Sequence, residues 1–180
     1  MKYEIFSGDN AKEKTFVDRS HKKDYILHVS THGFFQDNGA FADPMQNSGL
    51  LFANSQQYWE NPSLVGTIEE KDGILRADEI SSLDLNGCRL VVLSACQTGM
   101  GKEVAEGVFG LQRAFKLAGV QNVLMSLWKV NDDATQKLMI NFYESLLNGK
   151  EPNEALRLAQ LELRHKGYPV SQWAPFILLN

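Results

Sequence analysis

Two short stretches of the sequence pass from apolar residues to small residues and then to a side chain that can take part in catalysis. Residues 26–33 end in His32 and Gly33, and residues 90–97 end in Cys96 and Gln97. A thiolate can attack a carbonyl carbon, and an imidazole can carry the proton to and from the reacting groups. These residue types indicate a Cys96/His32 dyad for acyl transfer, with the backbone N–H of Gly33 beside it as an oxyanion donor.

A second interpretation of Cys96 stays open at this point. A single cysteine just past an apolar strand is most often a small buried hydrophobic residue. The two roles differ in what the thiol must do, because a nucleophile needs a lowered thiol pKa and access to substrate. Residue spacing alone does not separate them.

The elements that position these residues follow an alternating pattern. Short aliphatic runs at residues 25–30, 89–93 and 122–127 alternate with stretches of helical period, which is typical of an α/β fold around a mostly parallel sheet. Ligand sites of such sheets lie beyond the carboxyl ends of the strands. Neighbouring strands are only ~4.8 Å apart, so His32 and Cys96 are expected to face one another there.

The rest of the chain is assigned from caps and turns. We expect a strand at residues 3–6, a helix at 11–19 capped by Asn10, an irregular loop region at 34–72 and a short helix at 78–83. Further helices are expected around 108–118, around 134–146 with Asp132 as N-cap, and at 153–165, before a last strand at 173–179. All 180 residues are assigned to a single domain.

Composition excludes several classes of function. The net charge is −4, and 43% of the residues are hydrophobic, without any run long enough for a membrane-spanning helix. We therefore expect no nucleic-acid or membrane contact, and a reducing, cytoplasmic location for a chain with two cysteines.

Weaker motifs are set aside on geometry. The run from Gly99 to Lys102 lacks the first glycine and the Ser/Thr of a phosphate loop. His28 and His32 are four apart on an extended strand and do not share a face as zinc ligands would on a helix. His28 is expected to be a packed strand residue and Cys88 an inert thiol. No metal and no cofactor is predicted.

Several ordered motifs resemble the CHAT family of caspase-like cysteine peptidases, which often occur with tetratricopeptide (TPR) repeats. They are HVSTHGFF at 28–35, VLSACQTG at 92–99, EGVFGLQRAFKLAG at 106–119, SLWKVNDDAT at 126–135, ALRLAQ at 155–160 and WAPF at 173–176. The resemblance implies a caspase-like three-layer sandwich, a mostly parallel central sheet flanked by helices. It also implies that full domains carry further elements upstream, so this chain corresponds to their C-terminal catalytic part.

The same resemblance implies roles for individual residues. His32 and Cys96 take the catalytic positions, and the N–H of Gly33 lies in the oxyanion hole. Asp132 and Asp133 lie near the pocket for the side chain before the scissile bond, where a carboxylate favours a basic residue. Trp128 is expected to form an apolar wall of that pocket. Gln97, which stands where many members carry Glu, is assigned to substrate binding beside the nucleophile.

The leading prediction is a cysteine endopeptidase that cleaves a protein or peptide substrate and is regulated by a TPR-type domain or protein. A non-catalytic caspase-like interaction module, or a fragment without a complete site, is the alternative. A thiol hydrolase or acyltransferase acting on other substrates is the third possibility. Cysteine labelling separates the first two, because only a live site lowers the thiol pKa of Cys96.

Overall fold

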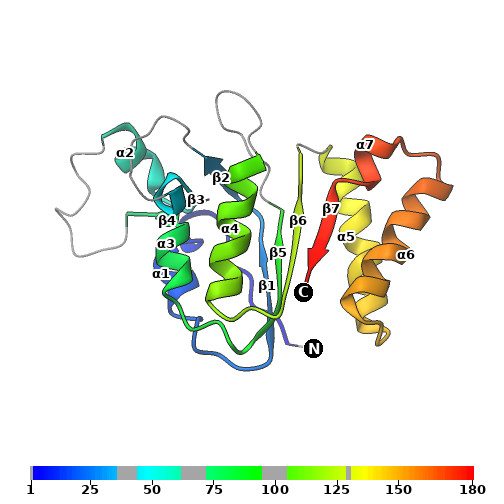
Figure 1. The fold of residues 1–180 in the computed structure, drawn as a ribbon, viewed down its shortest axis with the longest axis horizontal. Coiled ribbons are helices and arrows are strands. Elements are labelled where there is room, and N and C mark those ends of the chain that lie inside the picture. The colour runs from blue at the N-terminus through cyan, green and yellow to red at the C-terminus, as the bar shows by residue number, and fades with distance from the viewer. Residues whose placement is uncertain (1, 36–43, 62–71, 95–104, 129–130) are drawn as a thin grey trace.

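A four-stranded sheet lies between two layers of helices (Figure 1). The computed structural model describes residues 2–35, 44–61, 72–94, 105–128 and 131–180, and its helices and strands all lie within these ranges. The expectation of an α/β sandwich with a mostly parallel central sheet is confirmed.

The central sheet is built from the apolar runs that the sequence marks most clearly. Its strands are β1 (Tyr25–Val29), β5 (Cys88–Leu93), β6 (Asn122–Ser126) and β7 (Phe176–Leu179), in the order β1-β5-β6-β7. The first three are parallel, and β7 runs antiparallel to β6. Parallel neighbours need a crossover, and α4 (Ala105–Leu117) lies between β5 and β6 in the chain.

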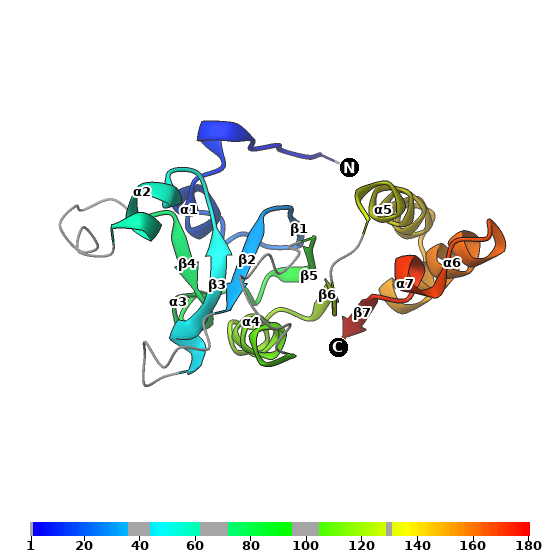
Figure 2. The same ribbon diagram turned by 90° about the horizontal axis from the view of Figure 1, so that it is seen from above.

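The two helical layers cover opposite faces of this sheet, as Figure 2 shows for α4 and α5 (Asp132–Leu147). One core cluster joins the sheet to α1 (Glu13–Val17), α3 (Ala77–Ser81) and α4. The other joins it to α5 and α6 (Pro152–His165), with the short α7 (Val170–Trp173) beside them. Alternate residues of each strand point to opposite faces, so from Leu90 onward the even-numbered residues of β5 face α5 and α6.

A second, smaller sheet lies beside the first. It consists of β2 (His32–Phe35), β3 (Ser48–Leu51) and β4 (Ile74–Arg76), all antiparallel, and α2 (Ser55–Glu60) and two 3₁₀ turns, Gly8–Asn10 and Pro44–Asn47, complete the elements of the described chain. The irregular loop expected at residues 34–72 is wrong for the part that is described, which includes the second half of β2, all of β3, and α2. The strands are four residues or fewer, too short to show a period of their own.

Several expected element boundaries differ from the structure. The last strand, expected from residue 173, begins at Phe176, because Trp173 ends α7. Residues 3–6 form no strand, because no described strand lies beside them; Tyr3 is 81% exposed. The first α-helix has Lys12 as its N-cap rather than Asn10. The N-cap of α5 is Asn131, whose side-chain oxygen accepts a hydrogen bond from the Ala134 N–H at 3.2 Å, so Asp132 is the first helical residue.

Helix termination follows the sequence closely. Gly119, at φ +97°, ends α4 in the left-handed region that other residues rarely adopt. A Cβ at this position would also lie 2.3 Å from the side-chain oxygen of Asn86. This tight turn returns the chain directly into β6.

Candidate active site

His32 stands where the chain passes from the large sheet to the small one. Ser30 and Thr31 alone separate the end of β1 from the start of β2. The Thr31 hydroxyl donates a hydrogen bond to the Leu51 carbonyl oxygen, which fixes this crossing. The His32 side chain is exposed, and the adjacent Gly33 is buried and paired with Leu50 in β3.

The carboxyl end of β5 lies beside this crossing. Val29 of β1 is in register with Leu93 of β5, and the Ser94 N–H donates to the Val29 carbonyl oxygen at 3.0 Å. Cys96 follows Ser94 by two positions, and Cys96 and Gln97 lie outside the described residues. The structure thus brings together the two strand ends that carry the expected dyad, as the topological argument required.

The three predicted substrate-binding residues that follow β6 do not share one environment. Asp132 lines a cavity against the central sheet. Asp133 forms an ion pair with Lys137 at 2.7 Å on another side of the helix. The Trp128 indole N–H donates to the Ser171 carbonyl oxygen at 3.0 Å, which ties this loop to α7.

Sequence reasoning missed a hydrogen-bonded group at the same strand ends. His28 Nε2 lies 3.1 Å from Ser94 Oγ, and the Tyr143 hydroxyl lies 3.0 Å from His28 Nδ1. The His28 and Tyr143 rings are also stacked, with centroids 5.6 Å apart. A polar residue at an apolar strand position, which His28 is, was the available signal, but its partners depend on strand register and on the placement of α5.

Desolvation acts on both rings of this group. It lowers the pKa of His28, whose neutral form is therefore favoured, and raises the pKa of Tyr143. A neutral imidazole has one N–H and one acceptor nitrogen, so it can join a hydroxyl donor on one side to a hydroxyl acceptor on the other. The group links β1, β5 and α5 through uncharged hydrogen bonds.

A cavity of about 640 Å³ opens next to this group, between the sheet and α5. Three serines, one from the carboxyl end of each parallel strand, lie on its wall: Ser30, Ser94 and Ser126. The strand register aligns them, because Val29 pairs with Leu93 and Leu93 pairs with Met125 one position earlier. The cavity thus lies at the sheet edge where the candidate dyad is expected.

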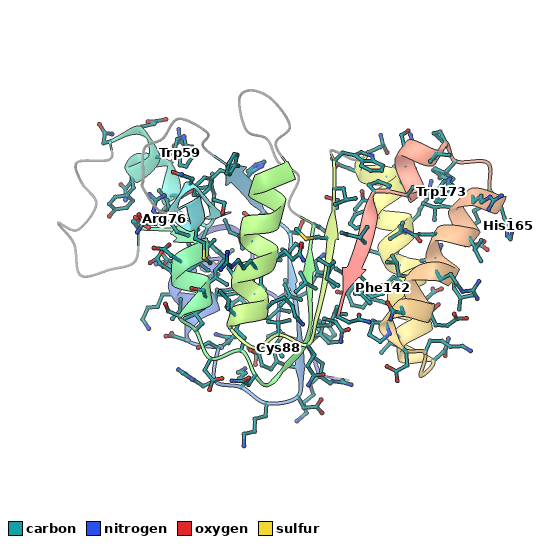
Figure 3. All side chains as sticks on the ribbon, in the orientation of Figure 1. Trp59, Arg76, Cys88, Phe142, His165 and Trp173 are labelled. Carbon is teal, nitrogen blue, oxygen red and sulfur yellow. The ribbon has the colours of Figure 1, made fainter. Side chains whose placement is uncertain are left out.

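The second cysteine is remote from these groups. Cys88 is the first residue of β5, at the opposite end of the strand, and is fully buried (Figure 3). Its thiol donates to the Leu90 carbonyl oxygen at 3.3 Å, and burial raises the pKa of Cys88 to about 11. Its surroundings are those of the inert thiol that the sequence predicted.

A family comparison agrees with this arrangement of strand ends and motifs. The model of the CHAT domain matches residues 2–180, nearly the full length of the chain. The chain belongs to the CHAT family.

Two curated proteins match part of this CHAT domain. They are tetratricopeptide repeat protein 28 from human, 39% identical over 110 residues, and its mouse counterpart, 38% identical over 111 residues. Each alignment covers 59% of this chain and 4% of the relative. The matched segment is thus a small part of these long proteins, which are named for tetratricopeptide repeats.

Two further findings concern the described residues alone. None of the helices in the described part of the chain combines the length and the apolar character needed to cross a bilayer. Within the same residues, His, Cys, Asp and Glu side chains form no group of three that could hold a metal ion.

Proposed function

We propose that this CHAT domain is a cysteine endopeptidase in which Cys96 is the nucleophile and His32 the general acid and base. Support comes chiefly from the junction of β1 and β5, where the Ser94 N–H to Val29 O hydrogen bond joins the strand leading to His32 with the strand leading to Cys96. Family membership adds the expectation of caspase-like chemistry at these positions.

The proposed reaction has two halves. His32 takes the proton of the Cys96 thiol, and the thiolate forms a C–S bond to the scissile carbonyl carbon. The N–H groups of Gly33 and Cys96 stabilise the oxyanion. The C–N bond then breaks as His32 returns the proton to the leaving amine. Water, deprotonated by His32, hydrolyses the thioester and restores the thiol.

Substrate selection in this proposal rests on residues after β6 and beside the nucleophile. Asp132 faces the cavity and has no basic neighbour among the described residues that line it, so it favours a basic residue before the scissile bond. Asp133, Trp128 and Gln97 are assigned supporting contacts with the peptide. A TPR-type domain or protein is the proposed regulatory partner, in keeping with the two TPR-named relatives.

A fluorogenic peptide library that varies the residue before the scissile bond tests this function. We expect cleavage after Lys or Arg by the unaltered chain, and none by Cys96→Ala or His32→Ala variants that keep the unaltered melting temperature. Cys88→Ala is the matched control and keeps the activity. Cleavage by a purified Cys96→Ala protein would refute the assignment of the nucleophile.

Selectivity has its own matched pair of variants. Asp132→Asn is expected to reduce the preference for basic residues about tenfold, the loss of one charge-assisted hydrogen bond. Asp133→Asn is expected to change the preference less, because the native Asp133 carboxylate is already paired with Lys137. A library preference for acidic residues contradicts the role of Asp132.

Alkylation measures whether the thiol is activated without requiring the right substrate. With iodoacetamide near neutral pH and mass spectrometry as the readout, we expect Cys96 to react well before Cys88, since the pKa of Cys88 is raised. His32→Ala is expected to slow the labelling of Cys96 only. Equal, slow labelling of both thiols would favour a non-catalytic interaction module.

A further inference from the structure

The cavity between the central sheet and α5 has a chemical pattern that peptide cleavage at Cys96 does not require. Eight of its lining residues lie on one stripe of α5 at spacings of three and four. They are Asp132, Thr135, Gln136, Met139, Ile140, Tyr143, Glu144 and Leu147. The stripe runs the length of the helix, so the cavity is elongated along α5.

Charge within the cavity has one sign. Among the described residues that line it, Asp132 and Glu144 alone are charged at neutral pH, and none is a Lys or Arg. The lowered pKa of His28, whose two ring nitrogens already contact Ser94 and Tyr143, keeps that ring from supplying a positive charge. The basic residue of the first helical turns, Lys137, contacts Asp133 and Tyr168 instead. Anionic ligands are thereby disfavoured.

The two carboxylates are far apart. They are separated by twelve positions on α5, which corresponds to about 18 Å along the helix axis at 1.5 Å per residue. A single ammonium ion cannot meet both. Between them Met139 and the half-exposed Ile140 form an apolar centre, with the polar Thr135 and Gln136 toward Asp132 and Tyr143 next to Glu144. The ligand that fits this order is cationic at both ends and aliphatic at its centre, with room for internal ammonium groups beside Thr135, Gln136 and Tyr143.

The sheet wall supplies an independent polar feature. Ser126 is only 8% exposed and lines the cavity, and its hydroxyl has no hydrogen-bond partner within the described chain. A hydroxyl on the wall of an open cavity that makes no bond to the protein is available to a ligand or to water. Together with Ser30 and Ser94 it places hydroxyl oxygens, which accept hydrogen bonds, at the Asp132 end of the cavity.

We propose that this cavity binds a linear aliphatic polyamine, with one terminal ammonium group at Asp132 and the serine row, the other at Glu144, and the chain across Met139 and Ile140. Each ammonium group donates its hydrogens to carboxylate and hydroxyl oxygens. The methylene groups cover apolar surface that is otherwise exposed to water. Binding does not require cleavage at Cys96.

Isothermal titration calorimetry with spermine tests the proposal, in the unaltered chain and in Cys96→Ala, where equal affinities are expected. Putrescine, which is too short to reach both carboxylates, and mono-N-acetylspermine, which carries one charged end, are expected to bind at least tenfold more weakly. Equal affinities for spermine and putrescine would overturn the two-ended site.

Variants locate the two ends. Asp132→Asn and Glu144→Gln are each expected to weaken spermine binding about tenfold, with melting temperatures measured to confirm folding. Glu154→Gln and Glu162→Gln, whose native carboxylates pair with Arg157 and Lys166, are the matched controls and leave the affinity unchanged. If the controls weaken binding as much, spermine responds only to the net charge of the chain and the site is refuted.

A lysine-containing peptide presents the same ammonium groups from a different source. A blocked Lys-Ala-Ala-Ala-Lys peptide is therefore titrated in parallel. Weaker binding of this peptide than of spermine supports a free polyamine as the ligand. Tighter binding of the peptide overturns that identity in favour of a basic protein segment.

Discussion

The two faces of the central sheet use the same strands for different purposes. The face toward α1, α3 and α4 is apolar along its whole length, and Val91, Val123 and Phe115 on this side are fully buried. The opposite face is equally apolar near Leu90 and Phe142, but it becomes polar toward the carboxyl ends of the strands. Figure 3 shows Phe142 within the packed part, between α5 and the sheet.

One face of the sheet thus contributes mainly to the stability of the fold, and the other carries the polar groups of the cavity. Close packing on the first face holds the strand register, and register decides that Ser30, Ser94 and Ser126 stand in one row. The second face is not closely packed at the carboxyl ends of the strands, where it borders a cavity lined by hydroxyl, imidazole and carboxylate groups. We therefore expect substitutions on the closed face to act on folding and those at the open end to act on binding.

The largest contrast is expected from truncating large side chains. Phe115→Ala on the closed face is expected to lower the free energy of unfolding by about 3–5 kcal/mol, because it leaves a cavity in packed surroundings. Ile140→Ala at the open cavity, where the side chain is 50% exposed, is expected to cost within about 1 kcal/mol. Urea unfolding followed by circular dichroism measures both. Similar losses would contradict the distinction between the faces.

A polar substitution sharpens the same comparison. Val123→Thr adds a hydroxyl of nearly equal size to the closed face, with no open space beside it, and is expected to cost about 1–3 kcal/mol. Ser126→Ala removes the hydroxyl that lacks a partner at the open end, and is expected to change stability by less than about 1 kcal/mol. A larger cost for Ser126→Ala would show that its hydroxyl is satisfied within the fold.

Two variants at the N-terminus of α5 test how much its N-cap contributes to stability beside the open face. Asn131→Ala removes the acceptor of the Ala134 N–H and is expected to cost about 1 kcal/mol. Asp132→Asn, one position later, keeps that cap and is expected to cost less, since only a favourable charge near the helix N-terminus is lost. Thermal unfolding of the two variants under one buffer condition gives the order. The reverse order would assign the cap to Asp132.

The smallest expected effect is a dependence on pH that belongs to the open face. Because the pKa of His28 is lowered in the folded chain, the unfolded chain binds more protons just below its own pKa of about 6.5. Stability is expected to fall as pH decreases through that value, until the folded pKa is passed. Unfolding measured from about pH 8 to about pH 5 in the unaltered chain and in His28→Gln isolates this contribution. A difference between them that does not vary with pH would contradict it.

Local patterns were sufficient to predict the central sheet and the larger helices. The runs that form β1, β5 and β6 are apolar enough to be found without knowledge of their partners, and α4 ends at Gly119 as its turn chemistry requires. The convergence of the two motif-bearing strand ends followed from topology alone. The part of the framework that leads to Cys96 was therefore predictable, whereas the strand that carries His32 was not.

The small sheet was not predictable, because its strands are defined by partners distant in sequence. Gly33 pairs with Leu50, and Gly49 pairs with Arg76. A Cβ on Gly49 would lie 2.5 Å from the Leu75 carbonyl oxygen, so glycine there permits close strand approach rather than a turn. The same limit applies to His28, whose contacts with Ser94 and Tyr143 join three separate elements.

The two-residue crossing from β1 to β2 has a mechanical consequence. His32 is the first residue of the small sheet, whereas the strand that leads to Cys96 belongs to the large one. The alignment of the proposed dyad is therefore set by the tilt between two sheets rather than by either sheet alone. Because β3 pairs with both β2 and β4, a displacement of the outer strand β4 would also shift β2, the strand that carries His32.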